Sequence, residues 1–212
     1  MNTKAIGIII AFTALTTVLN LIRIPVPFLP TFSYQFGDIV IVTAFLLFGP
    51  KYGISVGFLS MFVSMTILFG PGSFVGPPYY FVSVLAMLSG VYASEKLIAW
   101  RRGPFKTYSI VKPAISATIF SVLSRTLIML PLDYTVYGFL VSLVSGLSVS
   151  TSYAIVLAIM PSIILFNITV PLYVVPTSYF IAEKVAKGLK IGINSDSRVD
   201  STVLFLNVQN TK

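Results

Sequence analysis

Scarcity of charge restricts what this sequence can fold into more than any other feature. Lys, Arg, Asp and Glu together make up 9% of the residues, and hydrophobic residues make up 56%. A soluble domain has about 25% charged residues, and so few charges cannot cover a protein surface in water. The sequence therefore predicts an integral membrane protein.

The apolar residues form continuous runs, which favour helices over the alternating pattern of a transmembrane barrel. A spanning helix needs about 20 apolar residues, so the chain has room for about six or seven spans. We expect a single transmembrane domain over residues 1–190 and a polar C-terminal tail over residues 191–212. The expected helices cover residues 5–24, 39–48, 54–69, 79–98, 113–130 and 167–186. The fifth of these should end where Pro131 follows.

The basic residues indicate which side of the membrane each loop faces. If the N-terminus is inside, the inner loops hold Lys4, Lys51, Lys96, Arg101, Arg102, Lys106 and Lys112. The outer loops then hold only Arg23, in agreement with the positive-inside rule. Lysines at positions 184, 187 and 190 place the C-terminus inside as well, so the number of spans is even.

We therefore expect an all-α integral membrane protein, a six-transmembrane-helix bundle with cytoplasmic N- and C-termini. The apolar but Ser- and Thr-rich stretch over residues 137–160 should then not cross the bilayer completely. Because topology accounts for the net charge of +8, no nucleic-acid partner is expected.

Missing residue types exclude several kinds of chemistry. The chain contains no Cys and no His, so it has no thiolate nucleophile, no imidazole base and no zinc site of the usual kind. Its six carboxylates are too scattered for a metal centre, and no cofactor is expected. A Gly-rich phosphate loop is also absent. These absences predict a binding protein that is not an enzyme and has no energy source of its own.

Two polar residues in apolar segments are candidates for ligand binding. Arg125, beside Ser124, is deep in an apolar helix, where a charge usually faces a cavity or a partner. It is also only six residues from Pro131, so the alternative is a side chain that snorkels to the outer surface. Asn167 needs hydrogen-bond partners when buried, and these are either a ligand or another helix.

The proline-rich segment over residues 23–30 cannot be helical, and we expect it to be a structured outer loop. Asp38 follows it and either caps the next helix or pairs with Arg23. The aromatic residues near this loop are either interfacial anchors or a lid that stacks on a planar ligand. The expected substrate-binding residues are Asn167, Arg125, Ser124, Tyr34, Gln35, Asp38, Phe36 and Tyr79.

Small residues line one face of the first expected helix, at Gly7, Ala11 and Ala14. Small residues at this spacing let another helix approach closely. That helix belongs either to this chain or to a second membrane protein.

One segment resembles a known family. Residues 23–53, RIPVPFLPTFSYQFGDIVIVTAFLLFGPKYG, resemble the first loop and second helix of S components of energy-coupling-factor (ECF) vitamin transporters, and most of all the riboflavin type. The matching features are the prolines over residues 25–27, Asp38 and the Gly-Pro-x-x-Gly turn over residues 49–53. Residues 121–131 and 164–167 resemble the fifth helix and the beginning of the sixth.

This resemblance implies a protein of the prokaryotic cell membrane that binds a vitamin near the outer face, beneath the first loop. The family's Ala-x-x-x-Ala motif corresponds to Gly7 and Ala11, and implies docking to a transmembrane coupling protein that works with two ABC-type ATPases.

The sequence also departs from the riboflavin subgroup at three places. Val170 and Ser124 stand where that subgroup has Lys and Asn, and residues 33–35 lack its Lys. Riboflavin is the expected ligand. The alternatives are another vitamin or heterocyclic micronutrient, or a membrane assembly protein without a ligand.

Overall fold

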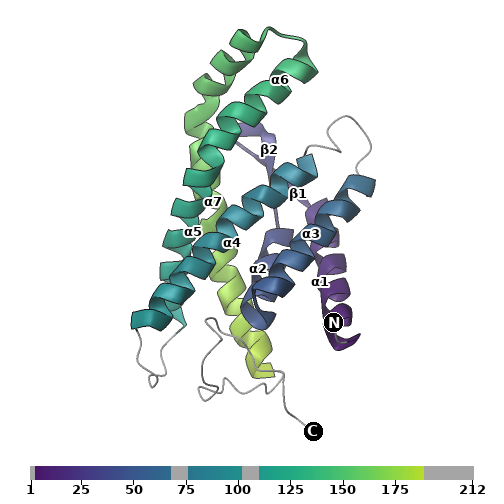
Figure 1. Cartoon of the computed structure of the whole chain (residues 1–212), viewed down its shortest axis with the longest axis vertical. Helices are drawn as coiled ribbons and strands as arrows, with labels where there is room; N and C mark the ends of the chain where they lie inside the picture. Colours follow the sequence, from purple (N-terminus) through teal and green to yellow (C-terminus); the bar gives the residue numbers. More distant parts are fainter. Residues whose placement is uncertain (1–2, 68–75, 102–109, 189–212) are drawn as a thin grey trace.

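The computed structural model describes residues 3–67, 76–101 and 110–188, and most of them are helical (Figure 1). The first part contains α1 (Thr3–Leu21), β1 (Arg23–Val26), β2 (Leu29–Gln35), α2 (Gly37–Phe48) and α3 (Pro50–Ile67). The remainder contains α4 (Gly76–Arg101), α5 (Val111–Leu132), the π-helical turn η2 (Asp133–Tyr137), α6 (Gly138–Ser145) and α7 (Val149–Gly188). The expected tail over residues 191–212, with Arg102, Lys106 and Lys190, lies outside the described residues.

Four helical segments in the described ranges are long and apolar enough to cross a membrane. They are Thr3–Leu21, Gly76–Trp100, Val111–Leu143 and Val149–Gly188. The helix α2 is apolar but has only 12 residues, which is about 18 Å at 1.5 Å per residue. The chain is therefore a helical membrane protein, built from helices of very unequal length.

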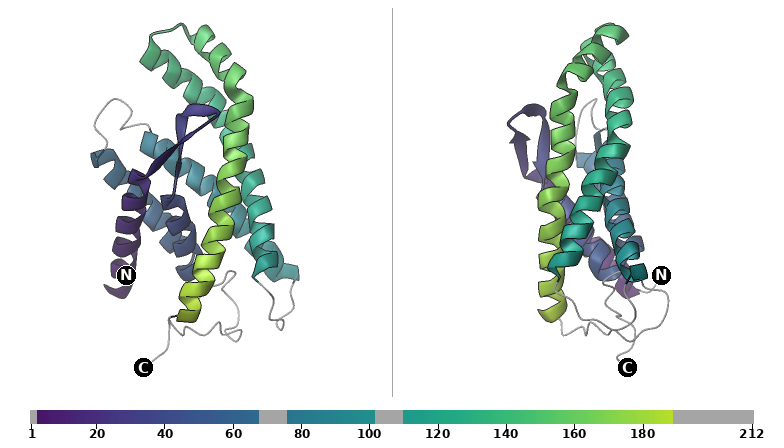
Figure 2. Two further views of the ribbon diagram at one scale, coloured as in Figure 1. Left: turned by 180° about the vertical axis from the view of Figure 1, so that it is seen from behind. Right: turned by 90° about the vertical axis from the view of Figure 1, so that its left-hand side faces the viewer.

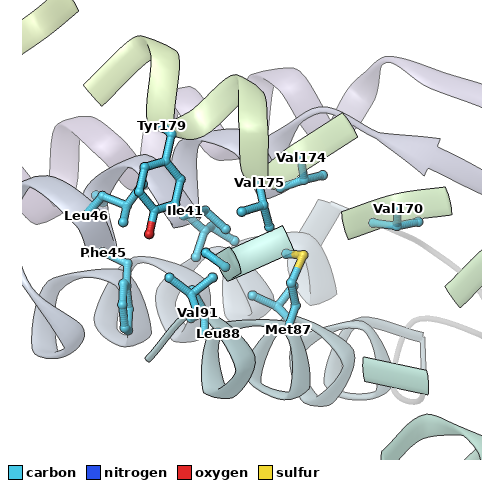
Figure 3. Packing of buried hydrophobic residues seen from close by; sticks show 14 of the residues in the cluster. Ile41, Phe45, Leu46, Met87, Leu88, Val91, Val170, Val174, Val175 and Tyr179 are labelled. Carbon is cyan, nitrogen blue, oxygen red and sulfur yellow. The ribbon is translucent and has the colours of Figure 1, made fainter. Parts of the chain in front are cut away.

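The apolar core lies where α2, α4 and α7 meet. Every residue of α2 from Val40 to Leu47 is buried, as expected for a helix that is apolar on all sides. Figure 3 shows its side chains packed against those of the other two helices. The labelled core residues are Ile41, Phe45 and Leu46 of α2, Met87, Leu88 and Val91 of α4, and Val170, Val174, Val175 and Tyr179 of α7.

The proline-rich segment before α2 is a β-hairpin, which the all-α prediction did not include. The strands β1 and β2 are antiparallel, with Arg23 opposite Gln35 and Pro25 opposite Ser33. Proline excludes a helix but is tolerated in an edge strand, where its missing N–H is not needed. Val26 and Leu29 are buried, and their burial holds the hairpin on the helices.

The prediction that the fifth helix ends at Pro131 is wrong. Pro131 lies inside α5, and the chain continues as a helix through η2 and α6 to Ser145. A proline removes one backbone donor from the helix, and a local π turn such as η2 lets the remaining groups find partners.

The last helix also begins earlier than expected, at Val149 instead of residue 167. It runs for 40 residues and contains Pro161, Pro171 and Pro176. Residues 137–160 thus belong to the distal ends of two long helices, which are joined by a turn at Gly146 with a left-handed φ of 67°. This helical hairpin lies at the end of the bundle opposite the beginning of α1 and the end of α7 (Figures 1 and 2).

The helices α4 and α5 are in backbone contact. A Cβ added to Gly90 would lie 2.5 Å from the backbone oxygen of Phe120, so only glycine fits there. Serines of α5 bond across this contact, with the Ser121 hydroxyl donating to the Met87 carbonyl at 3.1 Å. Close packing through small and hydroxylated residues is typical of membrane helices, and it sets the rotation of α5 that turns Arg125 inward.

Candidate functional site

Charged and amide side chains from α2, α5, η2 and α7 meet inside the bundle. Asp38 of α2, Arg125 of α5, Asp133 of η2 and Asn167 of α7 are each at most 3% exposed. Charges buried in a low-dielectric interior are stable only when they are paired and hydrogen-bonded. We call these four residues, together with Asn20, Tyr79 and Tyr80, the polar cluster.

Arg125 is at the centre of the polar cluster. Its Nε donates to Oδ1 of Asn167 at 3.2 Å, and its Nη1 lies 3.8 Å from Oδ2 of Asp38. The guanidinium carbon lies 5.8 Å from the centroid of the Phe166 ring. Arg125 therefore points into the bundle and does not snorkel to the surface. Its Nη1 is buried and has no hydrogen-bond partner among the described residues.

Asn167 links Arg125 to a second carboxylate. Its amide nitrogen donates to Oδ2 of Asp133 at 2.8 Å and to the carbonyl of Ile163 at 3.2 Å. Its amide oxygen accepts the bond from Arg125. The partners that a buried Asn needs are thus supplied by the protein itself.

Two consecutive tyrosines of α4 hold the two carboxylates. The Tyr79 hydroxyl donates to Oδ1 of Asp133, and the Tyr80 hydroxyl donates to Oδ1 of Asp38. On the other side, the amide of Asn20 donates to the Tyr80 hydroxyl at 3.4 Å. The network therefore continues to α1 and has one cation for two carboxylates.

Two of the roles expected for Asp38, as the cap of the next helix and as the partner of Arg23, are wrong. Phe36 is the N-cap residue of α2, and the first backbone N–H of that helix, at Gly37, donates to Oδ1 of Asn20 at 3.1 Å. Arg23 is exposed on β1, whereas Asp38 is 3% exposed and pairs with Arg125. A carboxylate in the first turn of a buried helix needs a cation close by, and α5 supplies it.

Aromatic side chains of the β-hairpin pack on α7 next to the polar cluster. The Phe32 and Tyr34 rings lie 5.1 and 5.6 Å from the Phe166 ring. The Tyr173 ring is in edge contact with Tyr34 at 5.7 Å and with Phe36 at 6.3 Å. Because Phe166 contacts both this aromatic layer and Arg125, the layer covers the polar cluster.

Two hydrogen bonds tie the hairpin to α7. The hydroxyls of Tyr34 and Thr169 are 3.0 Å apart, and the Tyr173 hydroxyl donates to the backbone carbonyl of Gln35 at 3.0 Å. Gln35 thus contributes its backbone to this contact. Opening the aromatic layer would require both bonds to break.

The structure brings most of the predicted site residues together, in two groups. Asn167, Arg125, Asp38 and Tyr79 belong to the polar cluster, and Tyr34, Gln35 and Phe36 belong to the hairpin contact with α7. Ser124 is separate, because its hydroxyl donates to the carbonyl of Ala86 at 2.8 Å in the contact between α4 and α5.

Sequence reasoning missed the roles of Asp133, Tyr80 and Tyr173. The sequence suggests that Asp133 lies at the end of a helix, but the chain continues as a helix past it and Asp133 is 1% exposed. One signal was available, because Asp133 is the last charged residue before the uncharged stretch of residues 134–182. Nothing in the sequence distinguishes Tyr80 and Tyr173 from the other tyrosines.

The small-residue face of α1 is turned away from the rest of the chain. Gly7, Ala11 and Ala14 are exposed, and no atom lies within 4 Å of a Cβ added to Gly7. Thr13 and Thr16 are buried on the opposite face. The alternative that this face packs within the chain is therefore wrong for the described residues.

The comparisons with known proteins agree with one another. A family model described as ECF-type riboflavin transporter, S component, matches residues 1–175. A solved structure titled as the S component of a bacterial ECF transporter is similar over 90% of this chain and 99% of its own, with 26% sequence identity and a TM-score of 0.65. No curated protein matches the sequence.

Proposed function

Because this chain belongs to the family of ECF-type riboflavin transporter S components, we propose that it is the substrate-binding subunit of an ATP-driven importer and that it binds riboflavin. The observation that carries this proposal is the polar cluster beneath the aromatic layer. A buried group of one cation, two carboxylates and amides is costly in a membrane protein and usually functional.

The two layers of the site are suited to a planar heterocycle with a polar chain. The rings of Phe32, Tyr34, Phe166 and Tyr173 offer flat faces and edges for stacking. Beneath them, Arg125 and Asn167 offer hydrogen-bond donors, and the carboxylates offer acceptors. Riboflavin combines a planar tricyclic ring with a chain of hydroxyls, and so matches both layers.

In the closed arrangement the site residues bond to one another. A ligand would replace some of these bonds with its own hydroxyl and amide groups, beginning at Nη1 of Arg125, which has no hydrogen-bond partner among the described residues. The hairpin would open by breaking its bonds at Thr169 and Tyr173, and it would close again over the ligand.

We further propose six membrane crossings with both termini cytoplasmic, in the cell membrane of a prokaryote. The beginning of α1 and the end of α7 lie at the same end of the bundle (Figure 1), which supports an even number of crossings. The short helix α2 and the adjoining α3 would complete the count beside the four long apolar segments. The transmembrane domain would extend to residue 190, with a tail over residues 191–212.

The proposed partners are a transmembrane coupling protein and two ABC-type ATPases. The exposed small-residue face of α1 supports a docking role, because it lets a foreign helix approach closely. We expect Ala11→Leu to reduce co-purification with the coupling protein about tenfold or more while riboflavin binding is unchanged. Leu172→Ala, at an exposed position of α7, is the control away from the small-residue face. Equal co-purification of both variants would contradict this docking site.

Another vitamin or heterocyclic micronutrient is the second candidate. The observation that favours it is Val170, which is 2% exposed and adds an apolar side chain where the riboflavin subgroup has a Lys. The site then depends on Arg125 from a different helix for its positive charge, and a different arrangement of donors suits a different heterocycle.

The decisive experiment is purification in detergent, followed by a visible absorption spectrum and small-molecule mass spectrometry. A yellow preparation with one flavin per chain is the expected result. A colourless preparation that carries another vitamin would keep the binding role and change the substrate. If no small molecule is bound and no vitamin raises the melting temperature, the protein is not a vitamin-binding subunit and an assembly role becomes the better interpretation.

A further inference from the structure

Residues 138–160 form a helical hairpin that extends beyond the β-hairpin in both views of Figure 2. It consists of α6, the turn at Gly146 and the first turns of α7, and we call it the distal hairpin. The whole of α7 has 40 residues, about 60 Å at 1.5 Å per residue. The hydrocarbon core of a bilayer is about 30 Å thick, so an upright α7 would hold the distal hairpin in water.

The composition of the distal hairpin does not suit water. Residues 134–182 contain no Asp, Glu, Lys or Arg, although a surface in water is normally about 25–35% charged. At the same time its large apolar side chains are unburied. Phe139 is 56% exposed, Leu143 is 68% exposed and Leu157 is 61% exposed.

The apolar surface of the distal hairpin is continuous with the lipid-facing surface of the spanning helices. On α7 the residues Leu157, Leu165, Leu172 and Phe180 are all exposed. They follow one another at intervals of seven or eight residues, which is about two helical turns. One stripe therefore runs along α7 from its spanning part into the distal hairpin without a polar break in this series.

The polar side chains at the tip of the hairpin are hydrogen-bonded within the tip. The Ser142 hydroxyl donates to the Leu147 carbonyl at 3.0 Å, and the Ser145 hydroxyl donates to the Val141 carbonyl. The Ser148 hydroxyl lies 2.7 Å from that of Thr151 and accepts the Thr151 backbone N–H. Internal partners are what polar groups require where water is absent.

We propose that the distal hairpin is embedded in lipid and that its exposed apolar residues contact acyl chains and lipid headgroups. The uncharged part of α7, residues 149–182, is about 50 Å long. It fits within a bilayer of about 40–45 Å, headgroups included, only when the helix is inclined to the membrane normal. The distal hairpin thus anchors the bundle in an inclined position. This inference depends on the membrane location of the chain and is independent of the ligand.

The absence of native cysteine makes the proposal directly testable with single-cysteine variants. Leu143→Cys and Leu157→Cys probe the distal hairpin, Leu172→Cys is the control for the spanning surface, and Arg23→Cys is the control for water. Each variant is reconstituted in nanodiscs of phosphatidylethanolamine and phosphatidylglycerol. The reaction rate with a membrane-impermeant maleimide is then measured. After separate bimane labelling in detergent, quenching by lipids brominated in their acyl chains is measured in the same nanodiscs.

We expect positions 143 and 157 to react at least about tenfold more slowly than position 23 and to be quenched as strongly as position 172.

Fast reaction without quenching would overturn the proposal. Slow reaction in native membranes but fast reaction in nanodiscs would also overturn it, because a protein partner would then cover the hairpin. Slow reaction in nanodiscs without quenching, together with disulfide formation between chains, would overturn it too. That result would mean that a second copy of the chain, and not lipid, covers the hairpin. If either variant is not monodisperse, Leu147→Cys and Val149→Cys test the same surface.

Discussion

The bundle contains two buried regions that are held together by different physics. The apolar core of α2, α4 and α7 consists of side chains such as Ile41, Leu46 and Val174, whose packing depends on shape and volume. The polar cluster contains Asp38, Arg125 and other groups whose burial is tolerable only because each one bonds to the next. Removal of one side chain should therefore disturb only its packing neighbours in the core. In the cluster, it should disturb every residue that is linked to it by hydrogen bonds.

This difference also separates stability from binding. Apart from the Tyr179 hydroxyl, which is bonded to Glu95, the core side chains have no donor or acceptor to offer to a ligand. Under the proposed function, the cluster would exchange its internal bonds for bonds to the ligand. Substitutions in the core should lower stability without changing ligand affinity in the folded fraction. Substitutions in the cluster should change both.

The largest effect is expected for Arg125→Ala. It leaves Asp38 and Asp133 buried without their cation, which should lower the free energy of unfolding by about 3–5 kcal/mol and riboflavin affinity by at least about 100-fold. Flavin fluorescence titration and thermal melting would measure the two effects. Arg125→Lys retains the charge but loses the fork geometry, so its affinity should fall between those of the wild type and the alanine variant. An alanine variant with wild-type affinity would remove Arg125 from the site.

A core substitution of comparable size provides the contrast. Leu46→Ala leaves a cavity where the side chain is 1% exposed, and it should cost about 2–5 kcal/mol of stability. The dissociation constant for riboflavin, measured below the melting temperature, should stay within about twofold. Leu172→Ala, at a position that is 53% exposed, is the matched control and should change stability little. A large loss of affinity in Leu46→Ala would show that the core and the cluster are coupled.

A smaller effect is expected where the β-hairpin closes over the cluster. Tyr34→Phe retains the ring that packs on Phe166 but removes the hydroxyl next to Thr169. Loss of one such bond is worth about 1 kcal/mol, so riboflavin should dissociate about fivefold faster in stopped-flow measurements. Phe28→Leu, at the exposed turn of the hairpin, is the control. An unchanged rate of dissociation in Tyr34→Phe would mean that the bond to Thr169 does not limit opening.

The smallest effect is expected for Ser124→Ala. Its hydroxyl bonds to the carbonyl of Ala86 in the contact between α4 and α5, and interhelical hydrogen bonds in membranes are worth about 0.6 kcal/mol on average. We expect a slight decrease in melting temperature and no change in riboflavin affinity. If affinity falls more than about threefold, Ser124 belongs to the binding site despite its separation from the polar cluster.

The candidate site was partly predictable from the sequence, for a clear reason. Arg125 and Asn167 are polar residues in apolar surroundings, and such residues are conspicuous in any membrane sequence. Asp133 is equally buried and Tyr80 is half-buried, but Asp133 lies just after a proline and Tyr80 lies beside another tyrosine. A residue near the end of a predicted helix looks like a surface residue, and only the continuation of α5 past Pro131 places Asp133 inside.

Asp38 shows the limit of local reasoning. Its position near the start of α2 suggested a capping role, and Arg23, at the other end of the proline-rich segment, suggested an ion pair. The structure pairs it with Arg125 from a helix far along the chain, because α2 is buried against the other helices and brings its first turn inside. The choice between two cations depends on packing, which no local pattern contains.

The sequence by itself determined that this chain enters a membrane as helices, because the low charge and long apolar runs allow no soluble alternative. It also determined where helices cannot form, since the prolines over residues 25–30 act on their own backbone and that of their neighbours. The tertiary structure alone decided that two helices continue into the distal hairpin, and which cation pairs with which carboxylate. The physical reason is the distance along the chain over which each effect acts. Hydropathy and proline act within one segment, whereas ion pairs, π turns and packing depend on which segments lie next to one another.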